Sequence, residues 1–224
     1  MENEEVCVVK KYCIEFLGEI WQNFADCIVV DKLNTGMGNR TFVCSLKRNE
    51  LLEKVIVKLY GNKHLAGESN HQTKCHSEAS EAVVFTLLNL KSMAPNLLGV
   101  FDGGRIEEFI QGRNLNHGDL QNMKLFETMG RKLAKFHSMN MPIRKTPVFI
   151  PLFMSHNSRS KIEKNFAHLP EKQQLIINKM MAFPLESELQ WVVNIADKIS
   201  KKVFSHNDLW LMNIMIKDEG EDLF

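Results

Sequence analysis

Residues 1–110 consist largely of short apolar runs, which are typical of β-strands, and of two stretches with helical periodicity. Apolar residues recur every three or four positions over residues 4–21, which predicts an amphipathic helix. A second helix is expected near residues 77–91, where an apolar run follows two glutamates. Asp102-Gly103-Gly104 predicts a hairpin turn. Strands are expected near residues 27–33, 41–46, 54–60, 97–101 and 105–110.

From residue 119 onwards the pattern changes to helices. A proline-containing linker, with Pro142, Pro147 and Pro151, follows the first of them. The helices are expected near residues 119–140, 155–168, 171–182 and 185–200. Large apolar residues of the first helix are interpreted as core packing, namely Met123, Phe126, Met129, Leu133 and Phe136. A strand-rich part followed by a helical part predicts an α+β protein.

The segment 203–216 carries the most specific chemical pattern in the chain. A short apolar run leads into His206-Asn207-Asp208, and Asn213 follows Asp208 five positions later, before a second apolar run. Phosphoryl transfer needs a carboxylate to orient the attacking hydroxyl and a ligand for the metal that bridges the phosphates. Asp208 and Asn213 are residues of these two types. The alternative is a polar turn in which both side chains cap backbone amides.

A glycine-containing turn, Gly36-Met37-Gly38-Asn39-Arg40, lies between the first two predicted strands. Glycines let backbone amides approach phosphate oxygens closely, because no side chain stands in the way. An ordinary hairpin turn would have the same composition. The turn is therefore a candidate phosphate-binding loop, to be weighed with the motifs that follow it.

Two charged residues follow in a suggestive order. Lys58 is embedded in the apolar run 55–60, so its ammonium group must find a polar partner or extend to solvent at the sheet edge. Glu81 lies in the predicted helix just before its apolar run, where it could also be a solvated charge near the helix N-terminus. A strand lysine held by a helix glutamate is the pair that positions nucleotide phosphates in kinases.

The chain resembles the choline/ethanolamine kinases, which share their fold with protein kinases and aminoglycoside phosphotransferases. The resemblance spans almost the whole chain. Besides the motifs above, it is carried by the stretches 94–101, 104–110 and 134–142. It implies a two-lobed, protein-kinase-like α+β fold with an incomplete helical C-terminal lobe. Residues 1–110 would form the nucleotide-binding lobe, and residues 111–224 a partial helical lobe with the catalytic loop.

The resemblance also implies roles for individual residues. Asp208 would be the catalytic base and Asn213 a ligand of Mg²⁺, while Lys58, paired with Glu81, would contact the phosphates. Arg113, just after the hinge, would lie near the nucleotide. The remaining ATP-binding positions would be Gly36, Met37, Gly38, Asn39 and Arg40 in the phosphate loop and Glu108, Phe109 and Ile110 in the hinge.

Three departures from the family pattern affect these expectations. Thr35 stands where the family usually has a glycine, Gly38 where it has a serine, and Trp210 where choline kinases commonly have a glutamine. An indole offers only a donor and cannot replace an amide.

The sequence given also stops at Phe224, before the family's second metal-binding aspartate and its aromatic cation site; Asp218 and Asp222 are interpreted as solvated charges. We expect a C-terminally truncated chain with an incomplete magnesium site, little turnover, and self-association through exposed apolar helix faces.

Composition narrows the classes of partner. A net charge of +1 gives no electrostatic reason to expect a nucleic acid or an anionic membrane. The acidic N-terminus and the lack of a long apolar run predict a cytoplasmic protein without a membrane span. Five cysteines without Cys-x-x-Cys spacing indicate buried or free thiols. His64, His71, Cys75 and His76 lack the spacing of zinc ligands, so we interpret 61–77 as a loop.

The leading hypothesis is an ATP- and Mg²⁺-dependent kinase that phosphorylates choline, ethanolamine or both, and so serves the biosynthesis of phospholipid head groups, including that of phosphatidylcholine. One alternative is another small-molecule kinase of the same fold, of the aminoglycoside type. The other is a non-catalytic nucleotide-binding or dimerisation partner. The residues present do not distinguish choline from ethanolamine as the substrate.

Overall fold

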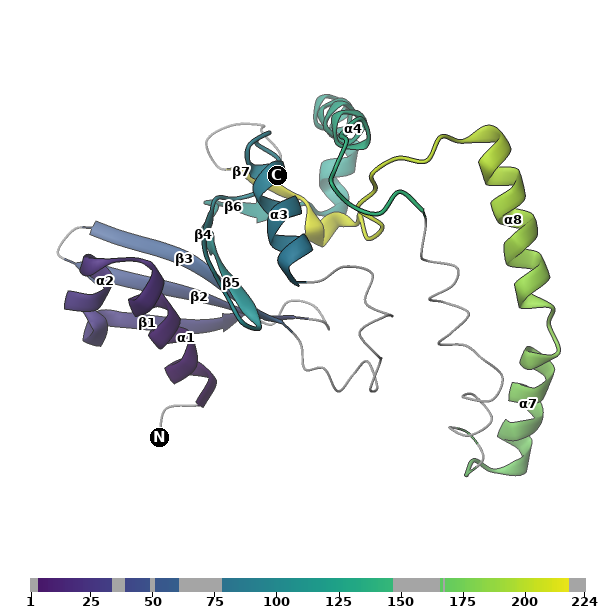
Figure 1. Cartoon of the computed structure of the whole chain (residues 1–224), viewed down its shortest axis with the longest axis horizontal. Helices are drawn as coiled ribbons and strands as arrows, with labels where there is room; N and C mark the ends of the chain where they lie inside the picture. The colour runs from purple at the N-terminus through teal and green to yellow at the C-terminus, as the bar shows by residue number, and fades with distance from the viewer. Residues whose placement is uncertain are drawn as a thin grey trace. The chain divides into compact units, whose positions relative to one another are not determined.

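The structure is a computed structural model that describes residues 4–33, 39–48, 51–60, 78–146, 166 and 168–217 (Figure 1). The chain forms two compact units. One comprises Met1–Met141 and Phe204–Phe224, and the other comprises Pro142–Val203. The lobe boundary expected at residue 110 stays a prediction. Among the described helices, none is long and apolar enough to cross a membrane.

A five-stranded antiparallel sheet forms the centre of the first unit, with the strand order β1-β2-β3-β5-β4. All five strands expected from the apolar pattern are confirmed. Their bounds are Ile28–Leu33 (β1), Asn39–Arg48 (β2), Leu51–Tyr60 (β3), Leu97–Phe101 (β4) and Gly104–Glu108 (β5). The predicted turn between β4 and β5 is also present, with Gly103 at a φ of 83°.

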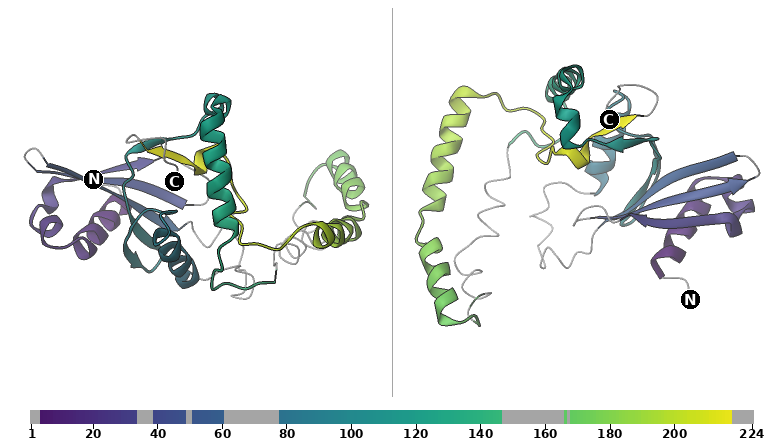
Figure 2. Two further views of the ribbon diagram at one scale, coloured as in Figure 1. Left: turned by 90° about the horizontal axis from the view of Figure 1, so that it is seen from above. Right: turned by 180° about the vertical axis from the view of Figure 1, so that it is seen from behind.

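One face of this sheet carries the main core. Phe42, Val57 and Ile106 are opposite one another on β2, β3 and β5, so they point to the same face, and each is almost fully buried. They pack with Val9 and Cys13 of helix α1 (Glu4–Phe16), which covers this face (Figure 2). Burying a large apolar side chain stabilises a fold by about 1.5–3 kcal/mol. This core therefore holds the sheet in place on its α1 side. The opposite face of the sheet is left for the candidate site.

The single helix expected over residues 4–21 is wrong in one respect, because the structure divides it into α1 and α2 (Glu19–Asn23). Gly18, with a φ of 85°, lies between them and adopts a conformation that glycine reaches without strain. The break lets Trp21 turn back into the core, where its indole Nε1 donates a hydrogen bond to Glu53 at 3.1 Å. On α1, Tyr12 stacks on Phe101 with a centroid separation of 3.6 Å.

Further elements of the first unit lie outside the sheet and lead to the expected catalytic loop. Helix α3 (Glu78–Asn89), expected near residues 77–91, contacts β4. After β5, the short strand β6 (Gly112–Asn114) pairs with β7 (Met215–Lys217), which comes about one hundred residues later. Figure 1 shows β7, in yellow, beside β6. This pairing joins the chain just after the expected hinge to the chain just after Asn213.

Helix α4 (Met123–His137) corresponds to most of the helix expected over residues 119–140. It begins at Asn122, whose side chain accepts a hydrogen bond from the Leu125 amide, and a short 3₁₀ helix (His117–Gln121) precedes it. The expected core role is wrong for Met123 and Phe126, which are 68% and 55% exposed. Leu125, one position away from Phe126, is the buried residue, because it lies on the helix face that meets Leu115.

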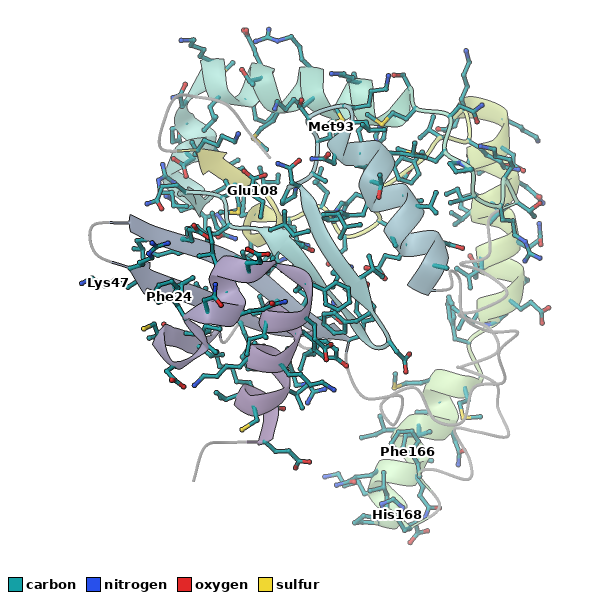
Figure 3. The ribbon with its side chains drawn as sticks, turned by 60° about the vertical axis from the view of Figure 1, so that its left-hand side comes forward. Phe24, Lys47, Met93, Glu108, Phe166 and His168 are labelled. Atoms are coloured by element: carbon teal, nitrogen blue, oxygen red, sulfur yellow. The ribbon has the colours of Figure 1, made fainter. Side chains whose placement is uncertain are left out.

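In the second unit, the two expected helices over residues 171–182 and 185–200 are confirmed as α7 (Glu171–Met181) and α8 (Leu185–Ile199). Neither helix has a fully buried residue. The helix expected near residues 155–168 lies almost entirely outside the described residues; Phe166 and His168, labelled in Figure 3, are both exposed.

Candidate functional site

The chain around Asp208 is shaped by an aromatic contact and by one unusual backbone angle. Phe204 stacks on Phe136 of α4, with a centroid separation of 4.6 Å. Asn207 then adopts a φ of 62°, a left-handed conformation that asparagine tolerates better than most residues. The next residue, Asp208, is exposed. His206 is also exposed rather than packed inward, with its ring 6.4 Å from that of Phe136.

Asp208 and Asn213 lie in direct contact. The side-chain amide of Asn213 donates hydrogen bonds to the Asp208 backbone carbonyl at 2.8 Å and to its carboxylate Oδ2 at 3.0 Å. A 3₁₀ turn, Leu211–Asn213, brings the two residues together. Because the nitrogen of the amide faces Asp208, its oxygen and the second carboxylate oxygen are left as acceptors.

These two oxygen-bearing side chains suit Mg²⁺, which prefers oxygen ligands and is bound through one or two protein side chains, substrate phosphates and water. Within the described ranges, no group of three or more His, Cys, Asp or Glu residues could hold a metal ion. The cluster of histidines and Cys75 in residues 61–77 lies outside those ranges. A metal held by Asn213 would need further ligands, such as substrate phosphates and water.

The expected hinge is fixed by Asn96. The Glu108 amide donates a hydrogen bond to the Asn96 carbonyl at 2.9 Å. The Glu108 carboxylate accepts two more, from the Asn96 amide at 3.1 Å and from its side chain at 2.7 Å. Ile110 is buried, and the Lys54 ammonium lies 5.1 Å from the ring centre of Phe109. Glu108, the first residue of the expected hinge, is labelled in Figure 3.

A row of charged side chains crosses the sheet face opposite the α1 core. Lys58 and Arg105 are directly opposite each other on β3 and β5. Glu107 lies between them, with Oε2 at 3.0 Å from the Lys58 ammonium and Oε1 at 2.5 Å from the Arg105 Nε. The other end of the Arg105 guanidinium pairs with Glu81 of α3 and bonds the Tyr60 hydroxyl at 3.1 Å.

The expected Lys58–Glu81 ion pair is therefore wrong in this structure. In the part of the chain that the structure describes, Lys58 pairs with Glu107 and Glu81 pairs with Arg105. The reason is the cross-strand register, which places the longer Arg105 side chain beside Lys58 and within reach of α3. A guanidinium group can bond two carboxylates through different nitrogens, as Arg105 does here.

Arg105 and Glu107 are buried, with 6% and 3% of their surfaces exposed. Burial alone would lower the pKa of Arg105. The charge and hydrogen bond of Glu107, the hydroxyl of Tyr60 and the charge of Glu81 outweigh it and raise the pKa. Arg105 thus stays charged inside the protein, where an unpaired charge would be strongly destabilising.

The phosphate loop is described only in part. Thr35, Gly36, Met37 and Gly38 lie outside the described residues, while Asn39 begins β2 opposite Tyr60. Arg40 is opposite Leu59, so it points to the α1 face and away from Lys58.

On the α1 face, Arg40 pairs with Glu5 at 2.6 Å, and Lys32 pairs with the same carboxylate at 2.7 Å. Hydrogen bonds from Lys32 and Arg40 lower the pKa of Glu5. Arg40 is therefore not part of the proposed ATP site.

Arg113, expected near the nucleotide, makes a bidentate pair with Asp119, both distances being 2.7 Å. Asp119 also accepts a hydrogen bond from the Asn116 amide at 2.8 Å, while the Asn116 side chain caps the 3₁₀ helix in return. The hydrogen bonds from Arg113 and from Asn116 lower the pKa of Asp119 to about 2. Arg113 thus stabilises the turn that follows the expected hinge.

Trp210 is 58% exposed and faces a shallow hollow on unit 1. The hollow has a volume of about 520 Å³ and is lined by Leu115, Asn116, His117, Met129, Leu209, Trp210, Leu211, Met212 and Ile214. Neither Asp208 nor Asn213 lines it. We assign it no catalytic role.

Sequence reasoning missed three residues that organise this site: Asn96, Arg105 and Glu107. A signal was available for the last two. Arg105 and Glu107 are two positions apart on a predicted strand, so they point to the same face as each other, and a lysine on a neighbouring strand needs a polar partner.

Comparisons with known proteins agree with the fold and with the family resemblance. The sequence profile described as choline/ethanolamine kinase matches residues 30–224. The chain is 28% identical to choline kinase alpha of Mus musculus, over 94% of this chain and 50% of that protein. It is 29% identical to the choline/ethanolamine kinase of Homo sapiens, over 95% of this chain and 52% of that protein. The chain thus spans about half the length of the curated relatives it matches.

Two solved structures have the same fold. The ethanolamine kinase of Plasmodium vivax gives a TM-score of 0.73 at 18% identity, covering 100% of this chain and 62% of that one. The choline kinase of Cryptosporidium parvum gives a TM-score of 0.62 at 20% identity, covering 95% of this chain and 62% of that one. The expected kinase-like α+β fold is confirmed.

Proposed function

We propose, from the premise that this chain belongs to the choline/ethanolamine kinase family, that it serves the transfer of the terminal phosphoryl group of ATP to the hydroxyl of choline or ethanolamine. The observation that carries the proposal is the direct contact between Asp208 and Asn213, at 3.0 Å between amide nitrogen and carboxylate oxygen. The product would be a phosphorylated amino alcohol, the head-group unit of the phospholipids.

In this proposal Asp208 orients the substrate hydroxyl and accepts its proton, while the hydroxyl oxygen attacks the terminal phosphorus and the bond to the departing ADP oxygen breaks. Asn213 would hold Mg²⁺ through its side-chain oxygen, while its side-chain nitrogen keeps the Asp208 carboxylate in place. When bound, Mg²⁺ would supply positive charge against the negative charge that develops during transfer. Lys58 supplies a further positive charge for the phosphate oxygens.

The adenine would meet the backbone from Glu108 to Ile110. Asn96 supports this role, because its three hydrogen bonds with Glu108 make the segment rigid before a ligand arrives. In the described part of the chain, no hydrogen bond uses the Ile110 amide, so it is available to an acceptor on the base. A segment fixed in advance loses less conformational entropy on binding.

The test is turnover of γ-labelled ATP with choline, ethanolamine and an aminoglycoside as separate acceptors. Asp208→Asn should lower the rate by about 10²- to 10⁴-fold, which is the usual contribution of a general base. Nucleotide affinity should remain. Asp197→Asn, which changes an exposed carboxylate in α8, is the matched control and should leave the rate unchanged.

The outcomes separate the alternatives. A measurable wild-type rate that Asp208→Asn retains would remove Asp208 from the mechanism. Preference for the aminoglycoside would indicate the other small-molecule kinase class. Binding of Mg·ATP without turnover of any acceptor would indicate a non-catalytic nucleotide-binding protein.

A further inference from the structure

Lys58 and helix α3 are connected through two buried side chains rather than by a direct ion pair. We propose that Glu107 is the positioning residue that holds Lys58 toward the nucleotide phosphates, and that Arg105 couples this position to α3. The inference rests on the proposed function, since it concerns the phosphate-binding part of the same site. It assigns the anchoring role to a strand residue instead of the helix residue Glu81.

The geometry of Glu107 suits this role. Each of its two carboxylate oxygens faces a different cation, Lys58 at 3.0 Å and Arg105 at 2.5 Å. Lys58 and Arg105 are direct cross-strand neighbours, and like charges in such a position repel each other. The carboxylate of Glu107 removes this repulsion and sets the direction of both side chains.

Burial decides which glutamate is the stronger anchor. The Glu107 side chain is 4% exposed, whereas that of Glu81 is 46% exposed. A buried pair is little screened by water, and an exposed one contributes little. The Lys58 side chain is 30% exposed, so its ammonium can keep the bond to Glu107 and still face a ligand.

Arg105 meets α3 at two points that are one helical turn apart. Its guanidinium pairs with Glu81 and lies 4.8 Å from the ring centre of Phe85. Tyr60, at the end of β3, bonds the same guanidinium. A shift of α3 must therefore move Arg105, and through Glu107 it must move Lys58.

The first experiment compares the affinity of the chain for Mg·ATP with its affinity for adenosine. Glu107→Gln should lower the affinity for Mg·ATP by about tenfold and leave that for adenosine unchanged, because only the phosphates meet Lys58. Glu81→Gln should lower the affinity for Mg·ATP by less than about threefold, because the Glu81 carboxylate is 46% exposed and does not pair with Lys58. A purely structural role for Glu107 would lower both affinities together. If Glu107→Gln does not fold, Glu107→Asp, which keeps the charge but shortens its reach, should show the same selective loss.

A second measurement does not depend on nucleotide binding. Acylation of lysines, followed by peptide mass spectrometry, should show faster labelling of Lys58 in Glu107→Gln than in the wild type, because the ammonium has lost its partner. Lys54 is the internal control, since it lies on the same strand and is also half-buried, and its labelling should not change. Glu81→Gln should leave the labelling of Lys58 unchanged.

The coupling to α3 is tested with Arg105→Lys, which keeps a positive charge but cannot bond two carboxylates with one planar group. In the wild type, Mg·ATP should slow hydrogen exchange of the α3 amides. In Arg105→Lys this protection should be lost. Equal protection in both proteins would overturn the coupling.

These experiments distinguish a failure of the proposed function from a failure of the role given to Glu107. If the wild type binds Mg·ATP no better than adenosine, the proposed function fails, and this inference fails with it. If the wild type prefers Mg·ATP but Glu81→Gln loses that preference and Glu107→Gln keeps it, the proposed function stands and Glu107 is not the anchor. Faster labelling of Lys58 only in Glu81→Gln would lead to the same conclusion.

Discussion

Gly112 lies so close to the carbonyl oxygen of Ile216 that a Cβ atom at position 112 would overlap it. The two residues belong to β6 and β7, the only paired strands outside the main sheet in the described part of the chain. Because β6 follows the expected hinge and β7 follows Asn213, this contact sets the spacing between the proposed adenine-binding backbone and the proposed catalytic loop.

We expect Gly112→Ala to destabilise the protein by about 1–3 kcal/mol, the usual cost of overpacking, because the β6–β7 backbones must move apart. The free energy of unfolding in urea measures this. Gly130→Ala is the control: Gly130 is in helix α4, a Cβ atom there would meet nothing within 4 Å, and alanine should stabilise the helix by up to about 1 kcal/mol. Equal effects of the two substitutions would mean that β6 tolerates separation from β7.

Asn213→Ala should weaken the magnesium-dependent part of ATP binding by at least about tenfold, since it removes a proposed metal ligand and the donor that holds Asp208. Stability should fall by only about 0.5–1.5 kcal/mol, because the lost hydrogen bonds are exposed. Titrations of ATP with Mg²⁺ and with EDTA separate the two effects. Asn194→Ala, on the exposed side of α8, should change neither. A magnesium effect that survives in Asn213→Ala would remove Asn213 from the metal site.

The strands could be predicted from the sequence because their burial follows the alternation of residue types. Val55, Val57 and Leu59 are buried on β3, and Lys58 between them points to the other face. Glu81 was also expected correctly on a helix. Each of these features depends on a few neighbouring residues, so the local pattern is sufficient.

The partner of Lys58 could not be predicted in this way. It depends on the register between β3 and β5, which joins residues 47 positions apart in the pair Lys58–Arg105, and on the reach of one arginine side chain. Helix α4 illustrates a similar limit, since Met123 and Phe126 fit an apolar stripe but the structure buries Leu125 instead. Which face of a helix meets the core is decided by tertiary packing.

The four described cysteines should differ sharply in reactivity. None of the four forms a disulfide with another described residue; Cys7 and Cys27 are exposed and Cys13 and Cys44 are buried, which agrees with the sequence expectation. A hydrogen bond with Cys13 and burial both raise the pKa of Cys44, so it stays protonated and a poor nucleophile. In the native protein, alkylation followed by peptide mapping should label Cys7 and Cys27 first. Labelling of Cys44 as fast as that of Cys27 would contradict the buried core.

The last prediction concerns the dependence of stability on pH. The Arg113 and Asn116 hydrogen bonds lower the pKa of Asp119 from its ordinary 3.8 to about 2 in the folded protein. Because the folded pKa lies below the unfolded one, the unfolded state binds the proton more readily. The stabilisation is therefore fully present above about pH 4 and is lost as the pH falls toward 2. Free energies of unfolding for the wild type and Arg113→Gln should differ at pH 5, and this difference should shrink steadily between pH 4 and pH 2. A difference that stays constant over this range would show that Asp119 does not depend on Arg113 for its low pKa.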